Sequence, residues 1–181
     1  DFEAPAPIVE ALQKRALHPN YGYTVRPDSY YKAMIDWLKR RQNWTIQKDW
    51  LCYSPGIVPA INFAIQAFTD PGEKVLIQSP VYYPFFAAVE NNNRELAISE
   101  LLCENQYYSM DFDDLEKQFA GGVKMMILCS PHNPVGRVWT RQELEKLTDL
   151  LLKYQVRLVS DEIHSDIVFK EHQHCPIASL S

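Results

Sequence analysis

The chain has 181 residues, of which 46% are hydrophobic and 23% charged, and this size and composition suit a folded domain with a core of its own. Its formal net charge of −5 argues against a nucleic-acid-binding surface, which shows clustered basic residues, and no apolar run approaches the roughly 18–20 residues of a membrane span. Its four cysteines show no CxxC spacing, so we expect reduced thiols in a cytoplasmic protein.

The N-terminal part of the chain predicts helices joined by irregular segments. Residues up to 24 are typical of a helix followed by an irregular arm, and residues 28–41 of a helix with an acidic start and a basic end. Pro55 and Gly56 then break the chain ahead of an apolar helix over 57–68. We expect residues 1–40 to form an N-terminal helix and arm region.

The rest of the chain predicts strands that alternate with helices. Strands are expected at residues 75–77, 95–101, 125–129 and 157–160. Most of these runs are continuously apolar, as strands covered by helices on both faces should be. Thr140 and Glu143 have the spacing of a capping box ahead of a further helix. The pattern predicts an α/β fold with three layers, α/β/α, and a mostly parallel sheet.

Two polar side chains follow neighbouring strands of this predicted sheet. Asn133 follows the strand at 125–129, and Asp161 follows the strand at 157–160. In open α/β sheets, ligands bind outside the carboxyl ends of the strands. An amide donor beside a buried carboxylate suits an aromatic ring that has a phenolic oxygen on one side and a basic nitrogen on another. Pyridoxal 5′-phosphate (PLP) is such a ring.

Several motifs together resemble the fold-type I PLP enzymes, the aspartate aminotransferase superfamily, and in detail the branch of cystathionine β-lyases and maltose-regulon modulators. The resemblance covers essentially the whole chain and implies that residues 41–181 are part of the large PLP-binding domain. Any one motif is weak evidence, but the five occur in the family's order. They are Tyr21-Gly22-Tyr23-Thr24, Ser54-Pro55-Gly56-Ile57-Val58-Pro59-Ala60, Ser79-Pro80-Val81-Tyr82-Tyr83-Pro84-Phe85, Cys129-Ser130-Pro131-His132-Asn133-Pro134 and Asp161-Glu162-Ile163-His164.

The resemblance implies roles for the residues that would contact the cofactor ring. Asp161 would keep the ring nitrogen protonated, because a carboxylate within hydrogen-bond distance raises the pKa of that nitrogen. Asn133 would donate to the phenolic oxygen, and Tyr82 would stack on the ring. Each residue also has an ordinary interpretation: a helix cap or loop charge for Asp161, a turn for Asn133 and core packing for Tyr82.

The resemblance also implies a phosphate site and a second subunit. Gly56, Ile57 and Val58 would offer free N–H groups at the start of a helix, although an ordinary helix start has the same sequence. Tyr23 matches a residue that reaches the phosphate of a neighbouring subunit, which implies a homodimer; otherwise it is a surface aromatic. His164 would play a supporting part near the cofactor.

Two elements of such enzymes are not found in the chain. The Schiff-base lysine of the family lies beyond the Asp161–His164 motif, and no lysine here matches it; the small C-terminal domain is also absent. We therefore expect a partial sequence that is inactive by itself. His172, His174 and Cys175 lack standard zinc spacing, so no metal is expected.

The parent protein is therefore expected to be a PLP-dependent carbon–sulfur β-lyase that acts on a small amino acid, either cystathionine or a cysteine S-conjugate. An aminotransferase would use the same cofactor residues. A non-catalytic regulator with the same fold is a further alternative, since the lysine is missing. A nicotinamide dehydrogenase is disfavoured, because no GxGxxG follows any predicted strand.

Overall fold

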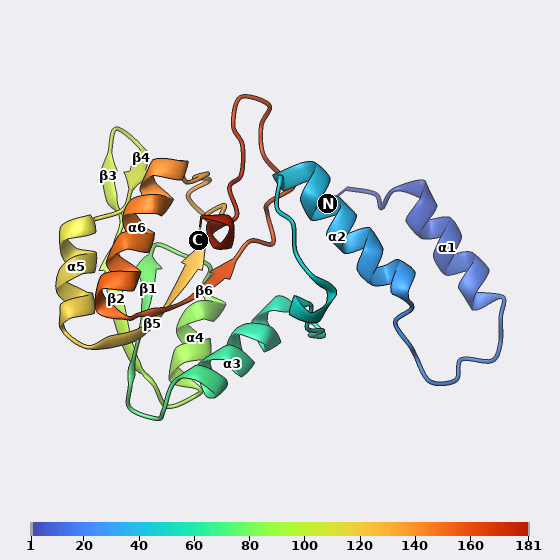
Figure 1. The fold of residues 1–181 in the computed structure, drawn as a ribbon, viewed down its shortest axis with the longest axis horizontal. Coiled ribbons are helices and arrows are strands. Elements are labelled where there is room, and N and C mark those ends of the chain that lie inside the picture. The colour runs from blue at the N-terminus through green and yellow to red at the C-terminus, as the bar shows by residue number, and fades with distance from the viewer. Residues whose placement is uncertain (1, 181) are drawn as a thin grey trace.

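A parallel sheet forms the centre of the computed structural model, which describes residues 2–180 (Figure 1). The strand order is β2–β1–β5–β6, and every neighbouring pair is parallel. These strands span Glu95–Glu100 (β2), Lys74–Ser79 (β1), Val123–Cys129 (β5) and Arg157–Asp161 (β6). A separate antiparallel hairpin pairs β3, Leu102–Glu104, with β4, Tyr107–Ser109.

Helices cover both faces of the sheet. One face packs against α3 and α4, and the other packs against α5 and α6 (Figure 1). This arrangement confirms the predicted α/β fold with a parallel sheet. The helices span Ala6–Ala16 (α1), Asp28–Gln42 (α2), Ile57–Phe68 (α3), Pro84–Glu90 (α4), Phe112–Ala120 (α5) and Arg141–Tyr154 (α6), and short 3-10 turns occupy Lys48–Trp50 and Ile177–Ser179.

Alternation along the strands explains why they are apolar on both sides. Val75 and Ile77 of β1 pack into the cluster below α3 and α4, whereas Leu76 between them packs into the cluster below α5 and α6. All three side chains are fully buried. Successive side chains of a strand point to opposite faces of the sheet, so a strand between two helical layers needs apolar residues at every position.

The helices predicted at 28–41 and 57–68 and the four predicted strands are present, with ends that differ by at most a few residues. The capping box of α6 is also present, with reciprocal hydrogen bonds between Thr140 and Glu143. The structure adds α4, α5 and the β3–β4 hairpin, which the sequence analysis did not assign. The seven residues of α4 are almost all apolar, so they carry no helical periodicity.

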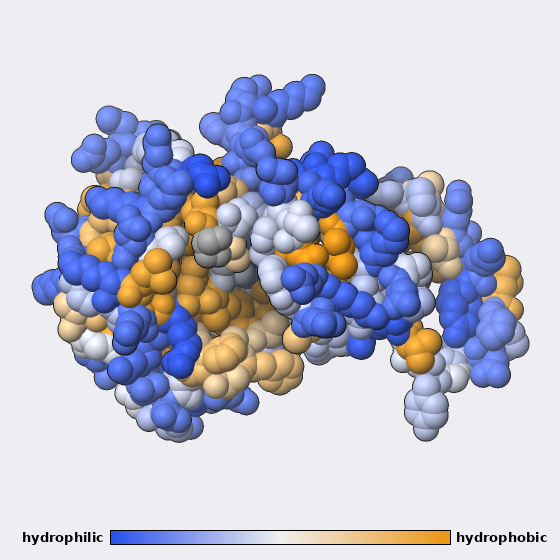
Figure 2. All heavy atoms as spheres, in the orientation of Figure 1, coloured by the Kyte–Doolittle hydropathy of each residue, from blue (hydrophilic) through white to orange (hydrophobic). Residues whose placement is uncertain are grey.

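The N-terminal helices extend away from the sheet (Figure 1). No residue of α1 is buried, and α2 contacts the loop after β6 through Trp37, whose indole N–H lies 2.9 Å from a carboxylate oxygen of Asp166. Apolar surface is visible over α3 and along α2 (Figure 2). Exposed large apolar side chains in this region include Ile8, Leu12, Tyr23, Val25, Met34, Trp37, Ile57 and Phe63. No helix among residues 2–180 has the length and apolar character needed to cross a membrane.

Arg94 closes the C-terminal end of α3, the helix whose other end lies at the site described below. Its Nε donates to Thr69 Oγ1 at 3.0 Å, its Nη1 to the Asn92 carbonyl at 2.6 Å, and its Nη2 to the carbonyls of Thr69 and Ile65. The last carbonyls of a helix have no partner within the helix, and a cation there also complements the helix dipole. Arg94 therefore fixes α3 against the α4–β2 turn.

We expect Arg94→Ala to lower the free energy of unfolding by about 2 kcal/mol, because the hydrogen bonds that a charged group makes to partly buried carbonyls are lost together. Urea unfolding of the full-length protein measures this change. Arg141→Ala is the matched control, since it breaks an exposed ion pair to Glu145 within α6 and should change stability by no more than about 0.5 kcal/mol. Equal losses in both variants would contradict the role of Arg94.

Candidate functional site

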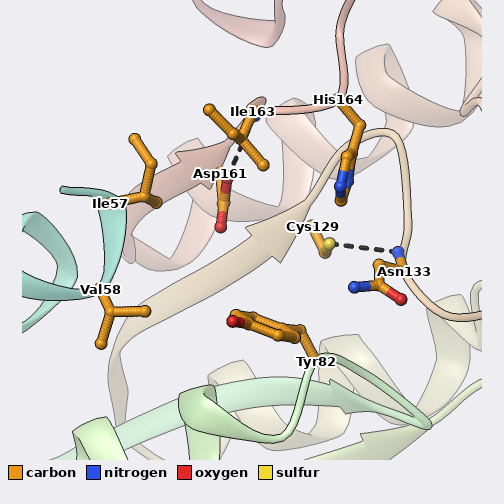
Figure 3. A pocket seen from close by; sticks show the side chains of 8 residues that line it. All are labelled: Ile57, Val58, Tyr82, Cys129, Asn133, Asp161, Ile163 and His164. Carbon is orange, nitrogen blue, oxygen red and sulfur yellow. Dashed lines mark hydrogen bonds between the residues drawn. The ribbon is translucent and has the colours of Figure 1, made fainter. Parts of the chain in front are cut away.

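A cavity of about 360 Å³ opens at the carboxyl ends of the strands. Its lining comes from the start of α3 and from the segments at or after the ends of β1, β5 and β6, so four segments far apart in the sequence meet there (Figure 3). The position agrees with the general rule for open α/β sheets. The lining residues are Ile57, Val58, Tyr82, Cys129, Asn133, Asp161, Ile163 and His164.

Asp161 places a carboxylate on the wall of this cavity. It is the last residue of β6, lies opposite Cys129 of β5 in the sheet register and is 8% exposed. One carboxylate oxygen accepts the Ile163 N–H at 3.1 Å, and no ion pair to Asp161 forms within residues 2–180. Burial raises the pKa of this carboxyl group, because a desolvated charge is disfavoured. The carboxylate therefore favours a cationic ligand.

Cys129 holds the loop that carries Asn133. The backbone N–H of Asn133 lies 3.3 Å from the Cys129 sulfur, and that sulfur lies 3.4 Å from the Pro131 carbonyl. Burial raises the pKa of Cys129 to about 11, so the thiol keeps its proton at neutral pH and can donate to Pro131 while it accepts from Asn133. The side-chain amide of Asn133 borders the cavity (Figure 3) and makes no hydrogen bond within residues 2–180.

Tyr82 lies in the segment after β1 and forms one wall of the cavity (Figure 3). Its ring is half-buried and packs edge-on against Phe85, with ring centroids 6.1 Å apart. Phe85 is fully buried in the core below α4. The two interpretations of this aromatic segment therefore apply to different residues: Phe85 packs in the core, and Tyr82 presents a ring to the cavity.

The start of α3 offers backbone donors at the cavity. The first helical hydrogen bond runs from the Ala60 N–H to the Gly56 carbonyl, so the N–H groups of Ile57 and Val58 precede it and have no partner within the helix. Ile57 and Val58 line the cavity, whereas Gly56 lies just outside its lining. Free N–H groups and the positive end of the helix dipole together favour an anion such as phosphate.

Of the other predicted residues, some line the cavity and some do not. His164 lines the cavity, together with Cys129 and Ile163, which the sequence analysis did not assign to the site. Cys129 follows an apolar run and reads as a core residue, so no pattern marked it. Tyr23 is fully exposed between α1 and α2 and does not line the cavity. His174 is buried, and its Nε2 lies 3.0 Å from the Glu162 carboxylate.

The side chains around the cavity fit PLP. The unpaired carboxylate of Asp161 suits a protonated ring nitrogen, the free amide of Asn133 suits a phenolic oxygen, and the ring of Tyr82 suits stacking. The N–H groups of Ile57 and Val58 suit the phosphate. All five of these residues line the same cavity in the structure.

The chain belongs to the aminotransferase class I and II family, whose family model matches residues 4–181. This confirms the superfamily that the motifs predicted. The whole chain is 44% identical to cystathionine β-lyase PatB of Bacillus subtilis (strain 168) and covers 47% of that protein. It therefore spans about half the length of the curated relatives that it matches.

Solved structures of similar proteins contain PLP. Cystalysin from Treponema denticola, solved with a PLP cofactor, has a TM-score of 0.96 and 42% identity to this chain, and the match covers 99% of this chain and 46% of cystalysin. The PLP-bound C–S lyase from Staphylococcus hominis has a TM-score of 0.96 and 36% identity, with 99% of this chain and 46% of that enzyme covered.

We expect Asp161→Asn to stabilise the cofactor-free, full-length protein at neutral pH. The raised pKa means that the folded state is penalised by the ionised carboxylate above that pKa, and that the penalty disappears as the pH falls through it. The stability difference between variant and wild type should therefore shrink towards pH 4. Urea unfolding at several pH values measures it, with Asp149→Asn, at an exposed position of α6, as the control. A difference that does not vary with pH would contradict the unpaired state of Asp161.

Proposed function

We propose that the full-length protein is a PLP-dependent carbon–sulfur β-lyase that acts on cystathionine or a cysteine S-conjugate. The observation that carries the proposal is the buried, unpaired carboxylate of Asp161 on the wall of a cavity that also presents an amide, an aromatic ring and free backbone N–H groups. The lyase names of PatB and of the Staphylococcus hominis enzyme support this choice of reaction.

The residues of the chain would share the work in the following way. PLP, when bound, withdraws electrons from the α-carbon of an amino acid, so that the proton there becomes acidic. Asp161 would raise the pKa of the ring nitrogen and keep it protonated. Asn133 would donate to the phenolic oxygen, Tyr82 would hold the ring by an offset contact worth about 0.5–1.5 kcal/mol beyond burial, and the N–H groups of Ile57 and Val58 would bind the phosphate.

An aminotransferase is the second candidate, because the matching family is named for that activity and would use the same residues. A product assay on the full-length protein separates the two. With cystathionine as substrate, pyruvate and ammonia in equal amounts support the lyase. A new amino acid that forms only when a 2-oxo acid is added supports the aminotransferase. If the PLP-loaded protein forms neither product, the non-catalytic regulator is favoured.

We also propose that the protein works as a homodimer in the cytoplasm, in which residues 1–40 form the arm and Tyr23 reaches the phosphate of the partner subunit. Tyr23 is fully exposed, and the α1 helix before it has no buried residue. Large exposed apolar patches mark interaction sites in soluble proteins. An arm that covers a second subunit would bury the apolar side chains of α1 and α2.

We expect Asp161→Asn to lower kcat/KM of the full-length enzyme by about 10²–10³-fold, a loss typical for the removal of one preorganised electrostatic partner. Asn keeps the shape of Asp and can still accept the Ile163 N–H, so the fold should be retained. Steady-state kinetics on PLP-saturated protein measure the change, with Asp149→Asn as the control. Activity of Asp161→Asn close to that of the wild type would argue against the role at the ring nitrogen.

We expect Tyr23→Phe to weaken PLP binding by about 10–100-fold, because one hydrogen bond to a charged group is lost. Mixed dimers of Tyr23→Phe and Asp161→Asn subunits test whether the site is shared. If Tyr23 acts across the interface, one of the two sites in the mixed dimer is wild type and activity returns. The assay is run at a PLP concentration that loads wild type but not the Tyr23→Phe homodimer. If Tyr23 acts within its own subunit, both sites of the mixed dimer remain defective there and activity does not return.

A further inference from the structure

His132 lies next to the candidate site but does not line the cavity. It precedes Asn133 in the loop after β5 and is 2% exposed. Its Nε2 atom lies 2.9 Å from the carbonyl oxygen of Pro80, and Pro80 comes two residues before Tyr82. The imidazole therefore joins the loop that carries the ring donor Asn133 to the loop that carries the stacking residue Tyr82.

The imidazole of His132 is a donor to this carbonyl. A carbonyl oxygen only accepts hydrogen bonds, so the proton of the ring must be on Nε2. Burial lowers the pKa of His132, which keeps the ring neutral at physiological pH, and Nδ1 makes no hydrogen bond within the described part of the chain. The ring thus carries one proton, and it is used to hold the Pro80 carbonyl.

His132 is itself fixed from several sides. Its ring meets the Trp139 ring edge-on, with centroids 5.5 Å apart, and the indole N–H of Trp139 donates to the Cys129 carbonyl at 2.9 Å. Its backbone N–H donates to the Arg137 carbonyl at 2.8 Å. Arg137 forms a partly buried ion pair with Glu143 at the start of α6, also at 2.8 Å. The imidazole is therefore a rigid part of the β5–α6 connection.

No other hydrogen bond joins the two loops within residues 2–180. Within residues 2–180, the hydrogen bond from His132 to Pro80 is the one that joins 80–83 to 130–137. Tyr82 packs on Tyr83 and Phe85, and the Asn133 N–H is bound by Cys129. A ring bound in the cavity would meet Tyr82 on its face and Asn133 at its edge. The relative position of these two groups would then depend on His132.

We propose that His132 is a positioning residue that sets Tyr82 relative to Asn133 and so tunes how PLP is held; this rests on the proposed function. His132→Leu removes the donor but keeps an apolar side chain, whereas His132→Gln places an amide N–H near the position of Nε2. We expect His132→Leu to weaken PLP binding by at least about tenfold, which corresponds to about 1.4 kcal/mol and lies within the range for a buried hydrogen bond. His132→Gln should stay within about threefold of wild type.

The measurement is a titration of the full-length, cofactor-free variants with PLP, followed by the absorption band of the bound cofactor and by thermal unfolding. Rescue by Gln of both affinity and band position supports the proposal. Wild-type affinity in His132→Leu, or equal loss in the Leu and Gln variants, would overturn it. If His132→Leu does not fold, His132→Asn replaces it, because its shorter amide cannot reach the Pro80 carbonyl.

A double-mutant cycle separates positioning from a general loss of stability. If His132 acts through Tyr82, the effect of His132→Leu on PLP affinity should shrink in a Tyr82→Ala background and stay complete in a Tyr23→Phe background. Additive effects with Tyr82→Ala would overturn the proposal.

Hydrogen exchange of the cofactor-free protein distinguishes a failure of this proposal from a failure of the proposed function. The quantity measured is the amide exchange rate of residues 79–86 and 129–137. Compared with wild type, these amides should exchange faster in His132→Leu but not in His132→Gln, whether or not wild type binds PLP. Unchanged exchange in His132→Leu would count against the link between the loops.

Discussion

The parallel pairing of β5 with β6 is the constraint on which the candidate site depends. Its register places Cys129 opposite Asp161, so the two strands end at the same height and the loop with Asn133 leaves the sheet beside the carboxylate. A shift of one residue would turn Asp161 to the other face of the sheet, because side chains alternate along a strand. The buried apolar residues of β5, together with the partly buried Leu158 and Val159 of β6, oppose that shift.

The electrostatics of the site follow from the same geometry. A carboxylate at the end of a buried strand loses water, and here no cationic side chain among residues 2–180 forms an ion pair with it. Folding alone therefore leaves Asp161 in an unfavourable state, which a cationic ligand would relieve. Cys129, which faces Asp161 across the strand pair, brings no compensating charge, because burial raises the pKa of its thiol to about 11 and keeps it protonated.

The sequence predicted the sheet and most of the cavity because their signals are local. Apolar runs between helical repeats define buried parallel strands, and the order of such strands brings Tyr82, Asn133 and Asp161 to one edge. Two parts were not predictable in this way. Cys129 reads as a core residue, because its contact with Asn133 depends on how the loop folds back. The link from His132 to Pro80 joins residues 52 positions apart, and no periodicity encodes such a contact.

The free N–H groups at the start of α3 have a practical consequence for reconstitution. They present hydrogen-bond donors to any tetrahedral oxyanion and do not distinguish a phosphate ester from inorganic phosphate or sulfate. If this end of the cavity binds the PLP phosphate, as proposed, buffer anions would compete with the cofactor there. We expect the apparent PLP affinity to be lower in phosphate than in an amine-sulfonate buffer of the same pH and ionic strength, and refolding mixtures that contain sulfate to load more slowly.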